Sequence, residues 1–489
     1  MYEKGKREKG RREKETKLCH VHRFFSLDWV NRIYYHYYYP HALFGILLNL
    51  QSTSVTVKMC SSNIDRSEIL IVGAGIFGIS TASHLASTHP NPSSITVLDR
   101  ATCPSPQAAS SDLNKIVRAD YSSPYYMDLA YEAMDVWSSS STLQSFYHRT
   151  GWIVLDEKDS DLAERVHENF RTSGRPDESK DISLEEVKSR WDGILRDIDT
   201  TDYDKAYLNP SAGWVDASLA TAAVMKEAIS KGIRHEVGEV QELVSSGNRL
   251  EGVRTKDGKL YAANKILLAT GAWTPSLMSP LEDVLGIEED RRTEKQMTCV
   301  GVCVAAFKLS AEEADHYGKL PVLIYGAKGE MMPPNRDRLF KFTNANTFTN
   351  YETLPSGRKI SVPSSKSQNY VPEQLKEQSM KIVRARLPQI LHGGRIPDIW
   401  RLCWDVVSPD QNQLITQHPD ARLSNLYMAT AGSLHSWKFL PIIGKYVVNV
   451  LHGQSNGKEK DNAWKWKSAW SDIGAHEKVL PGGDLKDFE

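Results

Sequence analysis

Hydrophobic positions first form a regular pattern at Ser67. Residues 68–72 read Glu-Ile-Leu-Ile-Val, a short apolar and β-branched run that is typical of a buried parallel strand. Residues 79–87 are rich in Ala and Ser and predict a helix, and residues 94–99 predict a second strand that ends at Asp99. Strand, helix and strand within about thirty residues predict a βαβ unit.

The turn between the first strand and the helix has the sequence Gly-Ala-Gly-Ile-Phe-Gly, which is the G-x-G-x-x-G fingerprint of dinucleotide binding. The first glycine allows the tight turn, the second lets the backbone approach a pyrophosphate, and the third lets the helix pack on the strand. An acid at the end of the second strand accepts hydrogen bonds from ribose hydroxyls. The predicted cofactor-binding residues of this unit are Gly73, Gly75, Ile76, Phe77, Gly78, Asp99 and Arg100.

A later segment favours FAD over NAD as the dinucleotide. Residues 265–273 form another apolar strand that closes on Ala-Thr-Gly, and a hairpin over 252–262 precedes it. A strand over 235–244 comes just before the hairpin. This order resembles the flavoproteins with two dinucleotide-binding domains, in which the late strand returns to the first sheet. The resemblance implies that Gly271 and Val240 lie near the cofactor.

The same pattern predicts an interleaved α/β chain. We expect a Rossmann-like FAD-binding domain, of the two-dinucleotide-binding-domain flavoprotein type, and a smaller α+β substrate domain built on an antiparallel sheet. The FAD-binding domain would take residues 67–150, 207–284 and 395–451, and the substrate domain residues 151–206 and 285–394. The remaining segments are an extension at 1–58, expected to be disordered or foreign to the fold, and a loosely attached tail at 452–489.

Composition and charge narrow the function classes. A formal net charge of -1 gives no reason to expect nucleic acid as a partner. The six cysteines include no C-x-x-C pair, so we expect free thiols, a reducing compartment and no bound metal. The apolar segment 42–50 is too short to span a bilayer, and no membrane partner is expected. The chain ends in Lys-Asp-Phe-Glu and not in the Ser-Lys-Leu peroxisomal signal, so we expect a cytoplasmic protein. We also expect a monomer.

Three segments together resemble the sarcosine oxidase and fungal fructosyl-amine (Amadori compound) oxidase family, within the D-amino-acid-oxidase-like superfamily. The first is the glycine turn at 73–78. The second is 109–121, ASSDLNKIVRADY, which is similar to that family's S-x-D-x-N-K-I-x-R-x-x-Y segment. The third is 431–445, AGSLHSWKFLPIIGK, which is similar to its closing G-x-x-x-H-G-F-K-x-x-P-x-I-G-K segment. The resemblance covers residues 67–451 and implies an FAD-dependent amine oxidase.

What the resemblance implies for single residues can be checked against elementary chemistry. A flavin that accepts hydride gains negative charge, which nearby cations and backbone N–H groups stabilise. By resemblance, Arg118 and Lys438 hold a substrate carboxylate, with Tyr121 also at the substrate. His435 either tunes the amine or the flavin, or packs to fix its loop. The further cofactor-binding residues implied are Ser111, Asn114, Lys115, Ser433, Leu434 and Lys438.

Two departures from the family pattern affect the expected chemistry. Many relatives bind flavin covalently through a cysteine at the position of Asp405, so we expect non-covalent FAD, with attachment through Cys403 as the alternative. The lysine that helps dioxygen accept electrons in the family is expected at Thr298, and Lys295 would need a three-residue slip to reach that place.

The leading hypothesis is hydride transfer from a secondary amine or N-substituted amino acid to FAD, giving an imine and, with dioxygen as partner, hydrogen peroxide. A sarcosine, fructosyl amino acid, pipecolate or saccharopine type of substrate fits. The alternatives are a flavin amine dehydrogenase with another acceptor, a tailoring oxidase of secondary metabolism, an NAD-dependent dehydrogenase, and a degenerate flavin-binding protein.

Overall fold

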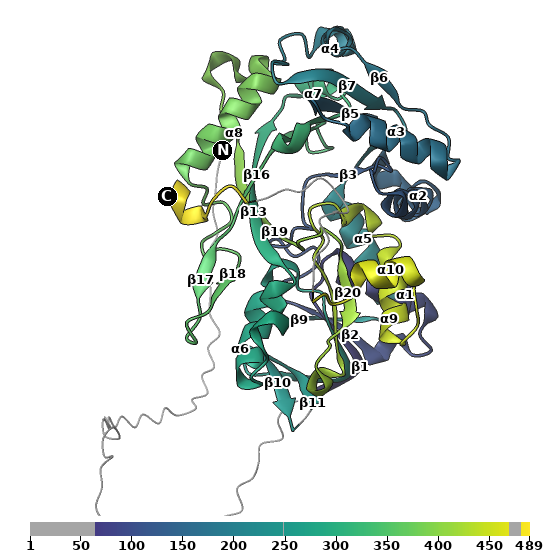
Figure 1. Ribbon diagram of the computed structural model, residues 1–489, viewed down its shortest axis with the longest axis vertical. Helices are drawn as coiled ribbons and strands as arrows, with labels where there is room; N and C mark the ends of the chain where they lie inside the picture. Colours follow the sequence, from purple (N-terminus) through teal and green to yellow (C-terminus); the bar gives the residue numbers. More distant parts are fainter. Residues whose placement is uncertain (1–63, 248, 469–480) are drawn as a thin grey trace, which may run out of the picture. The chain divides into compact units, whose positions relative to one another are not determined.

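The computed structural model describes residues 64–247, 249–468 and 481–489 (Figure 1). The predicted extension at 1–58 lies outside these residues. Met59–Glu489 forms one compact unit. None of the helices in the described part of the chain is long and apolar enough to cross a membrane.

The first eight-stranded sheet contains the predicted βαβ unit at its centre. Parallel pairing joins β1 to both β2 and β12, and β12 also pairs in parallel with β21. Alternate residues of β1 face opposite sides of the sheet, and Ile71 and Leu70 are both fully buried, which explains its unbroken apolar run. The strands are β1 (Ile64–Val72), β2 (Ile95–Asp99), β9 (Arg234–Val237), β10 (Val240–Ser246), β11 (Arg249–Thr255), β12 (Leu260–Leu268), β20 (Leu414–Gln417) and β21 (Leu426–Thr430).

One predicted strand of this sheet is two strands. The segment 235–244 is divided into β9 and β10, which lie at opposite ends of the strand order β10-β11-β12-β1-β2-β9. The break falls at Gly238, whose backbone N–H donates to the Asp99 carbonyl while the next residue turns toward β11. The hairpin predicted over 252–262 is present as the antiparallel pair β11 and β12.

The second eight-stranded sheet is antiparallel except where β14 pairs in parallel with β5. One face packs against α4 (Leu184–Ser189), α7 (Ala311–Tyr317) and α8 (Glu373–Arg386) through a hydrophobic cluster that includes Leu155 and Val383. The opposite face is turned toward the candidate site. In sheet order the strands are β19 (Ile399–Val407), β13 (Thr298–Lys308), β16 (Leu339–Phe348), β15 (Gly329–Met332), β14 (Val322–Tyr325), β5 (Trp152–Glu157), β7 (Tyr203–Asn209) and β6 (Lys180–Ile182).

The α/β fold class is confirmed, but two strands of the second sheet do not follow the predicted segment boundaries. β19 pairs with β13 although its residues fall in the segment 395–451 expected in the FAD-binding domain. β7 crosses the boundary expected at residue 207. In Figure 1 the long β13 and β19 extend from the second sheet toward the first, so the division of the chain into domains stays a prediction.

The helices cover the first sheet on both faces. α1, α5 and α9 pack together against one face, and α6 packs near β10 on the other. The helices are α1 (Ile76–Thr88), α2 (Pro124–Ser139), α3 (Leu162–Ser173), α4 (Leu184–Ser189), α5 (Ala217–Ser230), α6 (Thr274–Val284), α7 (Ala311–Tyr317), α8 (Glu373–Arg386), α9 (Ile443–Leu451) and α10 (Lys458–Trp464). The smaller sheets are β3 (Lys115–Val117), β8 (Gly213–Val215) and β4 (Tyr147–His148), and β17 (Tyr351–Thr353) with β18 (Lys359–Ser361).

The described parts of the C-terminal tail are packed, in contrast to the loosely attached segment expected at 452–489. Trp464 is 1% exposed and donates its indole N–H to Gln413 Oε1 at 2.8 Å. Leu485 is buried beside Phe348 and Trp404 in the second hydrophobic cluster. A few large apolar side chains therefore attach the tail. The sequence analysis overlooked them because most of the neighbouring residues are polar.

The contact between α1 and α9 predicts a substitution that destabilises the fold. A Cβ on Gly444 would lie 2.0 Å from the Ser80 carbonyl oxygen, so Gly444→Ala must push the two helices apart. We expect a loss of about 1–3 kcal/mol in the free energy of unfolding, measured by urea denaturation. The control is Ile229→Ala at a 44% exposed position of α5, expected to change stability by less than about 0.5 kcal/mol. Equal effects of the two substitutions would contradict the close packing.

Candidate functional site

The turn after β1 requires its glycines. Gly73 has φ +105°, and a Cβ there would lie 2.4 Å from the Ala269 carbonyl oxygen of the segment after β12. A Cβ on Gly78 would lie 1.9 Å from the Gly73 carbonyl oxygen. The backbone N–H of Ala74 donates to Asp99 Oδ2 at 2.8 Å, so the acid at the end of β2 holds the turn. Strand, turn and helix therefore meet β12 at backbone contact distance.

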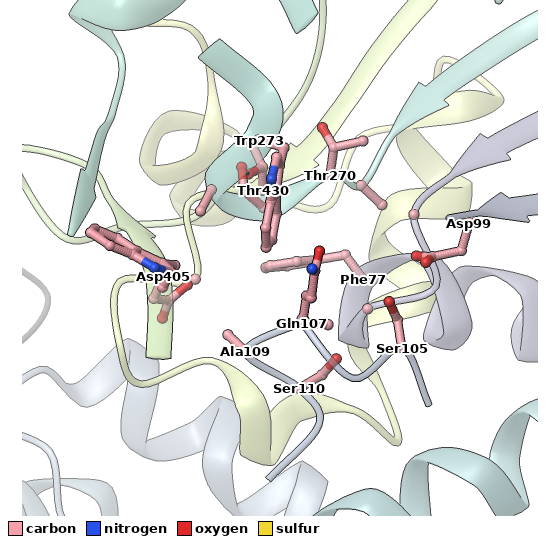
Figure 2. A pocket seen from close by; sticks show the side chains of 18 of the residues that line it. Phe77, Asp99, Ser105, Gln107, Ala109, Ser110, Thr270, Trp273, Asp405 and Thr430 are labelled. Carbon is pink, nitrogen blue, oxygen red and sulfur yellow. Dashed lines mark hydrogen bonds between the residues drawn. The ribbon is translucent and has the colours of Figure 1, made fainter. Parts of the chain in front are cut away.

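A cavity begins at this turn and extends along the carboxyl ends of the parallel strands. Figure 2 shows Asp99 toward one end and Asp405 toward the other, with Phe77, Gln107 and Trp273 between them. Ten of the predicted cofactor-binding residues line this cavity: Gly73, Gly75, Ile76, Phe77, Asp99, Arg100, Lys115, Val240, Gly271 and Leu434. Ser105, Gln107, Ala108, Ala109 and Ser110 line it as well, although none of them was among the predicted cofactor-binding residues.

Four other predicted cofactor-binding residues have structural contacts instead. Gly78 packs under the turn, and the Ser111 carbonyl accepts from Arg401 while its neighbour Ser110 lines the cavity. Asn114 is fully buried and donates to the Pro333 carbonyl at 3.1 Å. Ser433 Oγ accepts the Ser408 backbone N–H at 3.2 Å. These residues shape the cavity walls without lining them.

The cavity suits a dinucleotide at the turn. A Cβ on Gly75 would meet no described atom closer than Ser110 Oγ, at 3.7 Å, so the backbone there faces open space. Gly75 is also the N-cap of α1 and supplies no capping side chain, which leaves N–H groups of the first turn for an anion. The residues present therefore fit the pyrophosphate of FAD.

A second cavity adjoins the first. Both are lined by Lys115, Val302, Leu434 and Trp437, so these four side chains mark the place where the cavities meet. The four predicted substrate and catalytic residues, Arg118, Tyr121, His435 and Lys438, all line the second cavity. Lys438 does not line the first cavity. To contact the cofactor as predicted, its side chain would have to do so from the second cavity. A flat ring system bound where the two cavities meet would face both of them.

A buried hydrogen-bond chain connects three of these residues. Lys438 Nζ donates to the Tyr121 hydroxyl at 2.8 Å and to the His435 carbonyl at 2.6 Å. His435 Nε2 lies 2.9 Å from the Gln411 carbonyl, which can only accept, so this nitrogen carries the proton. His435 Nδ1, 3.1 Å from the Tyr121 hydroxyl, then accepts from that hydroxyl. Histidine therefore fixes the tyrosine that in turn holds Lys438.

Arg118 lies between two aromatic rings beside that chain. Its guanidinium carbon is 4.4 Å from the ring centre of Tyr121 and 4.6 Å from that of Trp152. Its guanidinium also donates to the Asp120 carbonyl. Burial, and next the charge of Arg118, hold the pKa of Lys438 well below its ordinary value. A buried amine whose protonation is disfavoured, beside the guanidinium of Arg118, forms a natural site for an anion.

A second group of lysines shares a buried carboxylate. Asp112 Oδ2 lies 2.8 Å from Lys115 Nζ and 3.2 Å from Lys341 Nζ. Burial acts to raise the pKa of Asp112, but the charges of Lys115 and Lys341 outweigh it and hold that pKa below its ordinary value. Lys341 also donates to the Asn114 carbonyl at 2.9 Å and is 1% exposed. Lys115 lines both cavities where they meet, and Lys341, which is not among the lining residues of either, is joined to it through Asp112.

Lys341 is the residue that the sequence analysis missed. It lies on β16 two residues before Thr343, which lines the second cavity, so the two side chains share a face of the strand. Lys295 lies elsewhere, with its side chain 45% exposed and paired with Glu289 at 2.8 Å. Thr298 begins β13 opposite Val407 and, like Lys341, is not among the residues lining either cavity, but Thr298 carries no charge. The sequence offered one sign of a buried lysine here, because Lys341 is the single charged residue in the otherwise apolar segment 339–342.

Cys403, considered for covalent attachment, and Asp405, which stands where relatives have the attaching cysteine, both line the first cavity. Cys403 is 6% exposed and pairs with Val302 across β19 and β13. Burial raises the pKa of its thiol, which disfavours the reactive thiolate, although Lys115 and Arg401 oppose this. Asp405 accepts the backbone N–H groups of Val406 at 2.8 Å and Leu434 at 3.0 Å, so its carboxylate holds the loop that follows β21.

Comparison with known proteins agrees with this arrangement. The family described as FAD dependent oxidoreductase (DAO) matches residues 68–450. The chain is 27% identical to L-saccharopine oxidase of Schizosaccharomyces pombe over 422 residues, which cover 82% of this chain and 93% of that protein. It is 21% identical to peroxisomal sarcosine oxidase of Mus musculus over 411 residues, covering 78% and 91%.

Among solved structures, fructosyl peptide oxidase from E. terrenum superposes with a TM-score of 0.74 at 27% identity, covering 86% of this chain and 97% of that one. The resemblance inferred from three motifs is thereby confirmed, and FAD is the expected cofactor. The chain belongs to the FAD-dependent oxidoreductase (DAO) family.

Proposed function

We propose that this enzyme oxidises a secondary amine or N-substituted amino acid that carries a carboxylate. The observation that carries the proposal is the buried pair Arg118 and Lys438 just beyond the boundary of the FAD cavity. Two relatives named for saccharopine and sarcosine support it, since both names denote secondary amines with a carboxylate on the carbon next to nitrogen.

The protein's own residues would position that substrate. Its carboxylate would accept hydrogen bonds from Arg118 and Lys438, which relieves their repulsion and restores the charge on Lys438. Tyr121 and His435 would keep Lys438 in place through the hydrogen-bond chain, which makes His435 a positioning residue. FAD, when bound, supplies the acceptor for the hydride that leaves the carbon beside nitrogen. The buried walls exclude water from this exchange.

Dioxygen as the final acceptor is part of the proposal, with Lys341 as the residue that assists it. A buried ammonium near the junction stabilises negative charge that develops on oxygen. Asp112 and the Asn114 carbonyl orient this lysine, as a group acting by fixed charge requires. Thr298, the position expected from the sequence, supplies no charge.

The decisive experiment is a visible spectrum of the purified protein, followed by anaerobic addition of an amine panel that includes sarcosine and saccharopine. A flavin band that bleaches with an N-substituted amino acid supports the proposal, and a flavin that no amine reduces overturns it. Acid precipitation of the same sample shows whether the flavin stays soluble, as expected, or is attached through Cys403. Size-exclusion chromatography tests the expected monomer, and location in the cytoplasm stays a prediction.

Gly75→Val is the matched cofactor-free control. A Cβ at this position meets no described protein atom closer than 3.7 Å, whereas the branched side chain of valine would occupy the space expected for the pyrophosphate. We expect a folded protein, by circular dichroism, that purifies without a flavin band. A holoprotein with full flavin content would contradict the assignment of the first cavity.

Lys438→Met tests the carboxylate pair while keeping the buried side-chain volume. Loss of one buried charged hydrogen bond to the substrate costs about 2–4 kcal/mol, or roughly 30- to 1,000-fold in kcat/KM. We expect this loss with carboxylated amines in steady-state assays, at unchanged flavin content. Lys445→Met, at a side chain 42% exposed outside both cavities, serves as the control. Activity within a few-fold of wild type in the Lys438 variant would refute the pair.

Lys341→Met separates the two half-reactions. We expect reoxidation of the reduced enzyme by dioxygen to slow by about 100-fold, in line with the loss of one group that stabilises developing charge. The rate of anaerobic bleaching by substrate should change much less. Both rates can be measured by stopped-flow absorbance. An unchanged reoxidation rate would contradict the role of Lys341, and it would mean that another group activates oxygen or that the enzyme is a dehydrogenase.

A further inference from the structure

The side-chain nitrogen of Lys438 donates to two acceptors inside the protein. Lys438 is 4% exposed, and its Nζ donates to the Tyr121 hydroxyl at 2.8 Å and to the His435 carbonyl at 2.6 Å. Because the Tyr121 hydroxyl gives its own proton to His435 Nδ1, its oxygen accepts from Lys438. The two acceptors therefore account for both N–H groups of a neutral amine, and the lone pair of such an amine can accept a proton.

The charges that face Lys438 do not compensate for its burial. The guanidinium carbon of Arg118 lies 4.4 Å from the centre of the Tyr121 ring, and Lys438 Nζ lies 5.1 Å from the same centre. Asp120 and Glu330 act against Arg118 with their negative charge. Burial and Arg118 outweigh them and hold the pKa of Lys438 well below its ordinary value.

The two carboxylates near Lys438 interact with other donors. Asp120 Oδ1 accepts from Asn209 Nδ2 at 2.7 Å, and Glu330 Oε1 lies 3.4 Å from Lys341 Nζ. In the described part of the chain, no hydrogen bond joins either carboxylate to Lys438. A carboxylate that entered with the substrate would bond Lys438 directly, and its charge would favour the protonated form of the lysine.

A substrate of the proposed class brings both a carboxylate and a proton. An N-alkyl amino acid is a zwitterion at neutral pH, and its ammonium nitrogen has no lone pair. Hydride can leave the neighbouring carbon only when that nitrogen has a lone pair with which to form the C=N bond. The carboxylate and the ammonium are attached to one carbon, so a group that bonds the first lies close to the second. The reaction therefore requires a proton acceptor at this place.

We propose that Lys438 is neutral before substrate binds and accepts the proton of the substrate ammonium as the substrate carboxylate binds. The inference rests on the proposed function and extends the role of Lys438 from binding to catalysis. One N–H bond of the ammonium breaks, and the lone pair of Lys438 forms the new N–H bond, so solvent neither gives nor takes a proton. The step leaves a charged Lys438 paired with the carboxylate, and an amine that has regained its lone pair.

The first test counts protons instead of turnovers. Methoxyacetate carries the carboxylate but no ammonium, and 2-aminoisobutyrate carries both groups but has no hydrogen on the carbon between them. Calorimetric titration of the holoenzyme in buffers of different ionisation enthalpy gives the number of protons taken up on binding. We expect uptake of about one proton with methoxyacetate, which Lys438 takes from solvent, and about none with 2-aminoisobutyrate, which supplies its own.

Two variants assign that proton to its acceptor. Lys438→Met should abolish the uptake with methoxyacetate, because the thioether cannot be protonated. Lys445→Met, at a side chain 42% exposed outside both cavities, should keep the wild-type uptake.

The second test compares amines of different basicity. The ammonium of N-(2,2,2-trifluoroethyl)glycine is far more acidic than that of sarcosine, so at mildly alkaline pH this compound is already neutral and needs no acceptor. Lys438→Met should slow anaerobic flavin bleaching by sarcosine at least about tenfold more than bleaching by the trifluoroethyl compound. In this variant the rate with sarcosine should rise about tenfold per pH unit, as the neutral amine becomes more abundant. Arg118→Met removes a carboxylate contact but no acceptor, so it should slow both compounds alike.

The outcomes separate this inference from the function on which it rests. No proton uptake with methoxyacetate, or equal uptake with the two ligands, overturns the proton transfer while amine oxidation stands. A Lys438→Met variant that slows both amines by the same factor at every pH also overturns it, and leaves Lys438 as a carboxylate ligand alone. A flavin that no amine of the panel bleaches defeats the proposed function itself.

Discussion

The close approach of the turn after β1 to the end of β12 is the constraint on which the site depends. Gly73 meets the Ala269 carbonyl at a distance that excludes any side chain, and this contact fixes the start of α1 against two neighbouring strands. Asp99 reinforces it from β2 through the Ala74 N–H. The cavity is thus bounded by parts of the chain that the parallel sheet brings to one edge.

Because β21 pairs with β12, the same contact also positions the segment after β21, which leads to the substrate cavity. The segment after β21 has positive φ at Ala431, Ser433 and Leu434, and Asp405 of the second sheet accepts the Leu434 N–H. These contacts set the position of His435 and Lys438. The cofactor cavity and the substrate residues therefore share one rigid loop, so their relative geometry does not depend on a flexible link between two sheets.

The buried cations of the site are of two electrostatic kinds. Lys115 and Lys341 share Asp112, so part of the cost of burying them is offset inside the protein. Within the described part of the chain, Lys438 donates hydrogen bonds to the Tyr121 hydroxyl and the His435 carbonyl and to no carboxylate. Its neighbour Arg118 lowers its pKa further. Lys115 and Lys341 thus have a hydrogen-bonded counter-charge within the protein, whereas Lys438 would gain one from a bound anion.

The sequence predicted what is local and missed what depends on distant pairing. The βαβ unit, its glycines and the hairpin over 252–262 follow from patterns within about thirty residues. The split of 235–244 into β9 and β10 was missed because the two edges of the sheet are set by β2 and β11. Lys341 was missed because it meets Asp112 across 229 positions of sequence. A motif gives residue types, but only strand register says which of them share a face.

The same limit explains why net charge carried no information about the substrate. Its value of -1 sums over the chain, whereas the substrate cavity is lined by Arg118 and Lys438 with the carboxylate of Asp120 beside them. Charges buried in a low-dielectric cavity are not screened by salt as surface charges are, so each retains its effect on a ligand. The local arrangement of charges therefore decides which ligand the cavity favours, and the net charge of the chain does not report it.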